Sequence, residues 1–114
     1  MPITFEDVSD TFRRIQLSGR LDMPGTEAIS LKFTNLAASS SRRVVVDLTG
    51  VSFLASIGIR EFITNAKALQ LRGGRMVLFV GDNAAVAKTL QVTGIDVLIP
   101  MFVDLAEADK AALA

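Results

Sequence analysis

The chain has 114 residues, which suits one domain with one hydrophobic core. Half of the residues are apolar, and 12 basic residues balance 12 acidic ones, so we expect no basic surface for nucleic acid or an anionic membrane. The absence of Cys excludes disulfides, thiolate metal sites and cysteine nucleophiles, and the absence of His removes the commonest general base and metal ligand of enzymes.

Two strands are predicted at the start of the chain. They cover residues 3–5 and 12–18 and are joined by a polar turn. In the second strand, Ile15 and Leu17 alternate with polar residues, so one face of this hairpin is expected to be solvated.

The first helix is predicted to follow Asp22, which can cap it, and its first turn tolerates Pro24. It should run to about Ala38 and end at the polar serines 39–41. The residues of its predicted buried stripe are Ile29, Phe33, Leu36 and Ala37.

The segment 43–72 is the centre of the predicted fold. A buried apolar strand is expected at 44–48, in which Asp47 is interpreted as a turn residue that accepts backbone hydrogen bonds. A short turn at Thr49-Gly50 is expected next, and then a helix from Ser56. The helical stripe that should face the sheet consists of Ile59, Phe62, Ile63, Ala66 and Leu69.

Ser56 and Ile57 stand out at the start of this helix. Ile57 points almost opposite the apolar stripe, so we expect it to be exposed with no core to enter. Ser56 lies in the first turn, where it is either a simple helix cap or a functional hydroxyl. We expect the working surface of the protein here.

Gly73-Gly74 is predicted to end the central helix with a left-handed cap. A buried strand at 76–80 should then pair in parallel with 44–48 through a right-handed crossover. Asp82-Asn83 is expected to cap a third helix, which should end at Gly94 and bury two residues, Val86 and Leu90.

The last two elements are predicted as a short strand at 97–99 and a terminal helix after a capping box at 104–107. The sequence therefore indicates a single α/β domain of order β-β-α-β-α-β-α-β-α. It should contain a mixed sheet of four to five strands and about four helices.

Several motifs in this order resemble those of STAS domains, the anti-sigma factor antagonist family. The run 46–59, VDLTGVSFLASIGI, is similar to the family signature. Residues 19–22 (GRLD) look like its G-x-L-D turn, 73–78 (GGRMVL) like its glycine turn and next strand, and 92–95 (VTGI) like the end of its third helix. The resemblance covers nearly the whole chain, residues 1–114. The chain looks like a free-standing antagonist.

The resemblance implies a bacterial partner-switching regulator and not an enzyme. Such a protein binds a histidine-kinase-like anti-sigma factor or switch kinase when unphosphorylated, is released by phosphorylation on one serine, and is restored by a serine phosphatase. Ser56 aligns with the acceptor, while Ala55 and Ile57 replace the family's acidic residue and second hydroxyl. The chain is then a cytoplasmic phosphoprotein, a monomer or weak dimer, that regulates transcription without nucleic acid or membrane contact.

The candidate site residues surround Ser56. For five of them a structural role is the alternative: Asp22 and Asn83 as caps, Gly58 for close packing, Arg60 as a solvated charge, and Ile57 as a side chain tucked under a neighbouring loop. The predicted partner-binding residues are Asp22, Met23, Leu54, Ile57, Gly58, Arg60 and Asn83.

Two other functions compete with partner switching. The chain could be a STAS subunit docked permanently on an ABC transporter ATPase, or a stress-signalling scaffold, and neither needs a modified serine. A small enzyme that uses Ser56, Lys88 or Asp47 is disfavoured, because no nucleophile elbow or phosphate-binding loop is present. We expect no cofactor, bound nucleotide or metal.

Overall fold

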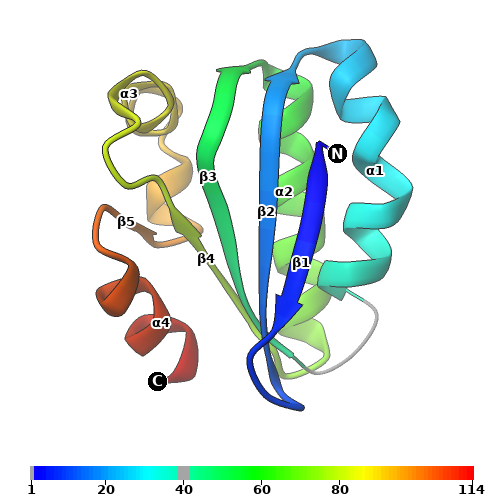
Figure 1. The fold of residues 1–114 in the computed structure, drawn as a ribbon, viewed down its shortest axis with the longest axis vertical. Coiled ribbons are helices and arrows are strands. Elements are labelled where there is room, and N and C mark those ends of the chain that lie inside the picture. Colours follow the sequence, from blue (N-terminus) through cyan, green and yellow to red (C-terminus); the bar gives the residue numbers. More distant parts are fainter. Residues whose placement is uncertain (1, 39–41) are drawn as a thin grey trace.

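Figure 1 shows one mixed sheet with helices packed against it. The structure is a computed structural model that describes residues 2–38 and 42–114. In chain order the elements are β1 (Ile3–Asp7), β2 (Phe12–Leu21), α1 (Met23–Ala38), β3 (Arg43–Leu54), α2 (Ser56–Leu71), β4 (Arg75–Phe79), α3 (Ala84–Thr93), the 3-10 helix η1 (Ile95–Val97), β5 (Met101–Phe102) and α4 (Leu105–Leu113). The predicted α/β order is confirmed. The polar stop predicted at 39–41 lies outside the described residues.

The five strands lie side by side in sequence order, β1-β2-β3-β4-β5. β1 pairs with β2 in antiparallel orientation, and the remaining neighbours are parallel. The parallel pairing predicted between the strands on either side of α2 is confirmed. Parallel strands place their carboxyl ends at one edge of a sheet, so α1 and α2 both begin at that edge.

The central strand β3 is buried on both of its faces. Val44 and Val46 belong to the larger core cluster with α1, α2 and α3, whereas Val45 packs in a second cluster with Ala108 and Ala112 of α4. Alternate residues of a strand point to opposite faces, which explains why this strand is continuously apolar.

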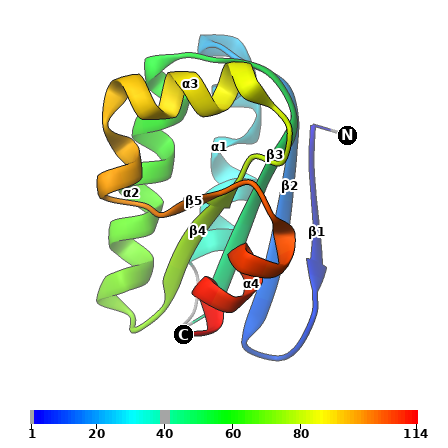
Figure 2. The ribbon, with the colours of Figure 1, turned by 90° about the vertical axis from the view of Figure 1, so that its left-hand side faces the viewer.

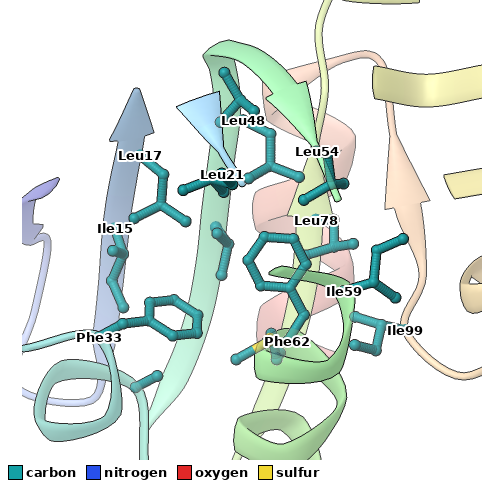
Figure 3. Close-up of a cluster of buried hydrophobic side chains, with 14 of the residues drawn as sticks. Ile15, Leu17, Leu21, Phe33, Leu48, Leu54, Ile59, Phe62, Leu78 and Ile99 are labelled. Carbon is teal, nitrogen blue, oxygen red and sulfur yellow. The ribbon is translucent and has the colours of Figure 1, made fainter. Parts of the chain in front are cut away.

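The larger cluster lies between the sheet and the helices α1 and α2 (Figure 3). Phe33 of α1 and Phe62 of α2 meet edge to face, with ring centroids 5.8 Å apart. The stripes predicted for both helices face this core, since Ile29, Phe33, Ile59, Phe62 and Leu69 are buried.

The turn predicted at Thr49-Gly50 is wrong, because β3 continues without a break to Leu54. Its pairing with β2 continues past this point, with register shifts that mark a bulge or similar irregularity. Asp47 still makes the local bonds expected of it: its carboxylate accepts from the backbone N–H and the hydroxyl of Thr49, at 2.9 and 2.7 Å. The bonds of a turn are thus accommodated within a paired strand.

The strand predicted at 97–99 is also wrong. Residues 95–97 form η1, and the fifth strand consists of Met101 and Phe102. The carbonyl oxygens of Pro100 and Phe102 accept the N–H groups of Leu78 and Val80, at 2.8 and 2.9 Å. Proline suits this sheet edge because its carbonyl can pair although it has no N–H.

The predicted helix ends are confirmed. Gly73 has a φ of 82°, and the N–H groups of Gly73 and Gly74 donate to the carbonyls of Gln70 and Leu69, which is a Schellman motif. Asn83 caps α3, the left-handed Gly94 ends it, and Asp104 caps α4.

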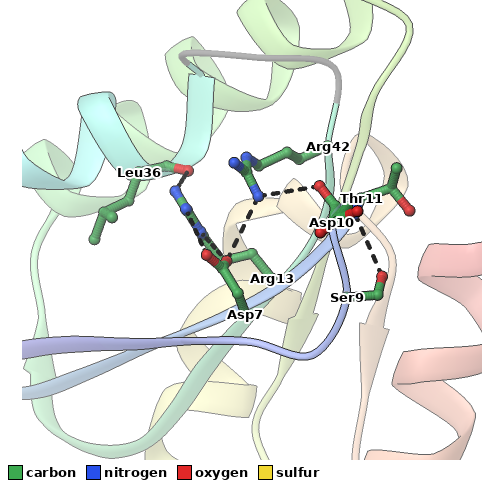
Figure 4. A network of polar contacts seen from close by, with 7 residues as sticks. All are labelled: Asp7, Ser9, Asp10, Thr11, Arg13, Leu36 and Arg42. Carbon is green, nitrogen blue, oxygen red and sulfur yellow. Dashed lines mark hydrogen bonds and ion pairs between the residues drawn. The ribbon is translucent and has the colours of Figure 1, made fainter.

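Arg13 joins the hairpin to the end of α1 (Figure 4). This nearly buried guanidinium donates to the carbonyl oxygen of Leu36 at 3.0 Å and grips both carboxylate oxygens of Asp7, at 2.6 and 3.1 Å. The bonds from Arg13 lower the pKa of Asp7. Arg13 therefore donates a hydrogen bond to a carbonyl in the last turn of α1, while the Asp7 carboxylate of β1 balances its charge.

Candidate functional site

The carboxyl edge of β2 and β3 brings the starts of α1 and α2 together. Leu21 and Leu54 are register partners at the ends of the two strands, and the N–H of Ala55 donates to the carbonyl oxygen of Leu21 at 3.0 Å. Asp22 and Ala55 therefore follow neighbouring strand ends, and Ser56 begins α2 next to them. Asp22 and Ser56 are 34 residues apart in the sequence, yet this edge holds both.

Ser56 is exposed and is the first residue of α2. Ala55 occupies the N-cap position and makes no side-chain cap, so the interpretation of Ser56 as the cap is wrong. Within residues 2–38 and 42–114 the Ser56 hydroxyl makes no hydrogen bond. It is therefore accessible at the positive end of a helix dipole.

Asp22 caps α1, as the sequence indicates. Its Oδ1 accepts from the backbone N–H of Gly25 at 2.9 Å, and its Oδ2 accepts from Nε of Arg20 at 3.2 Å. The Gly25 hydrogen bond, aided by Arg20, lowers the pKa of Asp22. A carboxylate is thus held ionised at the edge that also holds Ser56.

Arg20 and Phe53 also lie at this edge, and sequence reasoning missed both. They are register partners on β2 and β3, and the Arg20 guanidinium lies 4.5 Å from the centre of the Phe53 ring. Phe53 is 43% exposed and lies three residues before Ser56. The available signal was an aromatic residue within the motif, but Phe53 falls between the predicted turn at Thr49-Gly50 and the predicted helix from Ser56, where no element is expected.

Leu54 and Ile57, the two branched apolar residues predicted to bind a partner beside Ser56, are not exposed. Leu54 and Gly58 are buried, and Ile57 is partly buried and not exposed as predicted. A Cβ on Gly58 would lie 2.8 Å from Leu54 Cδ1, so glycine here permits close packing, as its alternative interpretation holds. The exposed apolar side chains near the helix starts are Met23, 62% exposed, and Phe53.

Asn83 and Arg60 have contrasting environments. The Asn83 amide nitrogen donates to the carbonyl oxygens of Leu48 and Val51, at 3.0 and 2.8 Å, and its oxygen accepts from the N–H of Val86. Asn83 is thus committed to joining α3 to β3, and its partner-binding role remains an untested prediction. Arg60 is exposed and forms no ion pair with any described residue.

The described residues include no cluster of three or more acidic side chains that could hold a metal ion. Across residues 2–38 and 42–114, no helix combines the length and apolarity needed to cross a membrane.

Several solved structures share this fold, including the following three. An anti-sigma factor antagonist from Mycobacterium paratuberculosis is 24% identical, with a TM-score of 0.84 over 98% of this chain and 93% of its own. An anti-sigma-factor antagonist (STAS) domain protein from Planctomyces limnophilus is 25% identical, with a TM-score of 0.79 over 96% of both chains. The Bacillus cell fate determinant SpoIIAA in its phosphorylated form is 20% identical, with a TM-score of 0.68 over 96% of this chain and 98% of its own.

Comparison with curated protein sequences finds no match. The family model of the STAS domain matches residues 6–108, which includes every element from β2 to α3 and the site described above. This match covers most of the chain and agrees with the order of its motifs. The chain therefore belongs to the STAS domain family.

Proposed function

We propose that the chain is an anti-sigma factor antagonist that works by partner switching. Unphosphorylated, it binds a histidine-kinase-like anti-sigma factor or switch kinase in the cytoplasm through the surface around Ser56. The kinase then transfers the γ-phosphoryl group of ATP to Ser56 Oγ: the new O–P bond forms, the bond to ADP breaks, and the hydroxyl proton is released. A serine phosphatase hydrolyses the phosphoserine and restores binding.

The observation that carries this proposal is the exposed Ser56 hydroxyl, which makes no hydrogen bond with the described residues and has no capping role. A hydroxyl that supports no part of the fold can be modified without unfolding it. Family membership supports the same role, as do the solved antagonists with this fold, one of them a phosphorylated form.

The helix start is a favourable place for a phosphate. Phosphoserine carries about −1.5 to −2 charges at pH 7, and an exposed helix N-terminus stabilises negative charge by about 0.3 to 1 kcal/mol. The fold should therefore tolerate phosphorylated Ser56.

The bound partner should not tolerate it. A phosphate on Ser56 would stand at the same edge as the Asp22 carboxylate and the exposed side chains of Met23 and Phe53. A partner docked there would have to desolvate a doubly charged group next to apolar contacts, and a loss of about 2.7 kcal/mol weakens binding a hundredfold. Phosphorylation can thus end binding without a change of fold.

The sequence departs from the family motif on both sides of Ser56. This departure favours a second function, which is permanent docking on an ABC transporter ATPase or a signalling scaffold. Ala55 and Ile57 stand where the resemblance implies an acidic residue and a second hydroxyl. A permanent subunit needs neither of those groups, nor a modified serine.

Affinity capture from extract of the source cell separates the two functions. The baits are wild type, Ser56→Ala, Ser56→Asp and Thr64→Asp, which adds the same charge at an exposed position on the same helix. Partner switching predicts that mass spectrometry finds a kinase-like ATPase on every bait except Ser56→Asp. If all four baits retain one transporter ATPase or scaffold equally, the permanent-subunit function replaces the switch.

A further inference from the structure

A groove lies at the opposite end of α2 from Ser56. It is formed by the C-terminal half of α2, the first residues of β3 and β4, and the segment between η1 and β5, and it has a volume of about 400 Å³. Figure 2 shows this last segment passing beside α2 on its way to β5. The volume falls within the range of small-molecule sites, about 300 to 1,000 Å³.

The groove carries an excess of positive charge. It is lined by Arg43, Lys67 and Arg75, and none of the described residues that line it is acidic. Arg43 and Arg75 are register partners on β3 and β4, where neighbouring like charges repel. Arg43 donates to the carbonyl oxygen of Ala114 at 3.3 Å, and neither Lys67 nor Arg75 forms an ion pair with the described residues. A bound anion would relieve this repulsion.

The rest of the lining is mainly apolar. Met76 of β4 belongs to the larger core cluster, and Ile63 of α2 packs against it. Both side chains form part of the groove wall. Val97 and Leu98 also line it, although they are 86% and 63% exposed. Exposed apolar groups next to cations without ion-pair partners match a ligand that has both an apolar body and an anionic end.

We propose that this groove binds an amphiphilic anion, a carboxylate or phosphate attached to an apolar chain. The anionic group pairs with Lys67 and the two arginines, whose planar guanidinium groups suit either oxyanion, while the chain covers Ile63 and Leu98. This site is independent of Ser56 and of the proposed switch. The groove lining on α2 begins at Ile63, about two helical turns after Ser56.

Titration of the full ¹⁵N-labelled chain, followed by NMR, tests the proposal. The probes are sodium octanoate, octyl phosphate, sodium acetate and 1-octanol. We expect saturable shifts of the groove amides, such as those of Gly74 and Leu98, with at least one of the two amphiphilic anions, and at least tenfold weaker binding of acetate and octanol. The relative affinities of octanoate and octyl phosphate distinguish a carboxylate from a phosphate ligand.

Substitutions test the role of the cations. Lys67→Gln and Arg75→Gln should each weaken binding of the tighter amphiphile at least tenfold, whereas Arg60→Gln, at an exposed position on α2 outside the groove, should leave it unchanged. Unshifted signals elsewhere show that the variants remain folded. The proposal is overturned if neither octanoate nor octyl phosphate gives saturable shifts, or if acetate or octanol binds as tightly as the tighter of these two amphiphiles. It is also overturned if all three variants bind that amphiphile with the same affinity.

Discussion

At the residue scale, Ser56 contributes little to folding. Its hydroxyl makes no hydrogen bond with the described residues, and the N-cap position belongs to Ala55. By contrast, the Asp22 carboxylate bonds the Gly25 N–H and so stabilises the first turn of α1. Two polar side chains at one sheet edge therefore have different duties: one holds the fold and the other is available for chemistry.

This difference predicts the effect of two alanine substitutions. Ser56→Ala should change the free energy of unfolding by less than about 0.5 kcal/mol, the usual range for surface changes, whereas removal of a true serine cap costs about 1 kcal/mol. Asp22→Ala should lower it clearly more than Ser56→Ala. Urea unfolding of both variants is the measurement, and a Ser56→Ala loss as large as that of Asp22→Ala would contradict it.

At the scale of elements, the Arg13 contacts hold β1 against the end of α1. Arg13 bonds the Leu36 carbonyl and both oxygens of Asp7, and Arg42 lies 3.5 Å from the same carboxylate. Protonation of Asp7 would remove the charge that balances the two cations, so this junction should be sensitive to acid.

The lowered pKa of Asp7 sets the pH range of this effect. The stabilisation is present above the unfolded-state pKa, about 3.9, and is lost as the pH falls through the lower folded-state value. Between pH 5 and pH 2 the Tm of wild type should therefore fall more than that of Asp7→Asn. The control is Asp96→Asn, because exposed Asp96 forms no ion pair with the described residues. Equal slopes for wild type and Asp7→Asn would refute the assignment.

At the scale of the whole molecule, stability depends on the core between the sheet and the α1–α2 pair. Phe62 is fully buried and packs on Phe33, whereas Leu71, on the same helix, is 90% exposed. Phe62→Ala should cost about 3 to 5 kcal/mol, a large part of the 5 to 15 kcal/mol that stabilises a typical domain. Leu71→Ala should cost less than about 0.5 kcal/mol. Thermal and urea unfolding are the measurements, and similar losses of unfolding free energy for the two variants would contradict this prediction.

The order of elements could be read from the sequence because its signals are local. The stripe that contains Ile59 and Phe62, the glycines after α2 and the cap at Asn83 lie within a few residues of the structure that they specify. The helical pattern that begins at Ser56 is local too, and so are the family motifs in which Ser56 aligns with the acceptor.

Contacts between distant segments decided the rest. β3 runs through Thr49-Gly50 because β2 pairs with it on both sides of that point, which outweighs the local preference for a turn. Arg20 meets Phe53, and Asp22 comes to the edge that holds Ser56, only because parallel pairing aligns two strand ends. Burial of Leu54 and partial burial of Ile57 likewise depend on how closely α2 approaches the sheet. Periodicity and capping are properties of a single segment, whereas exposure and proximity arise only when segments pack together.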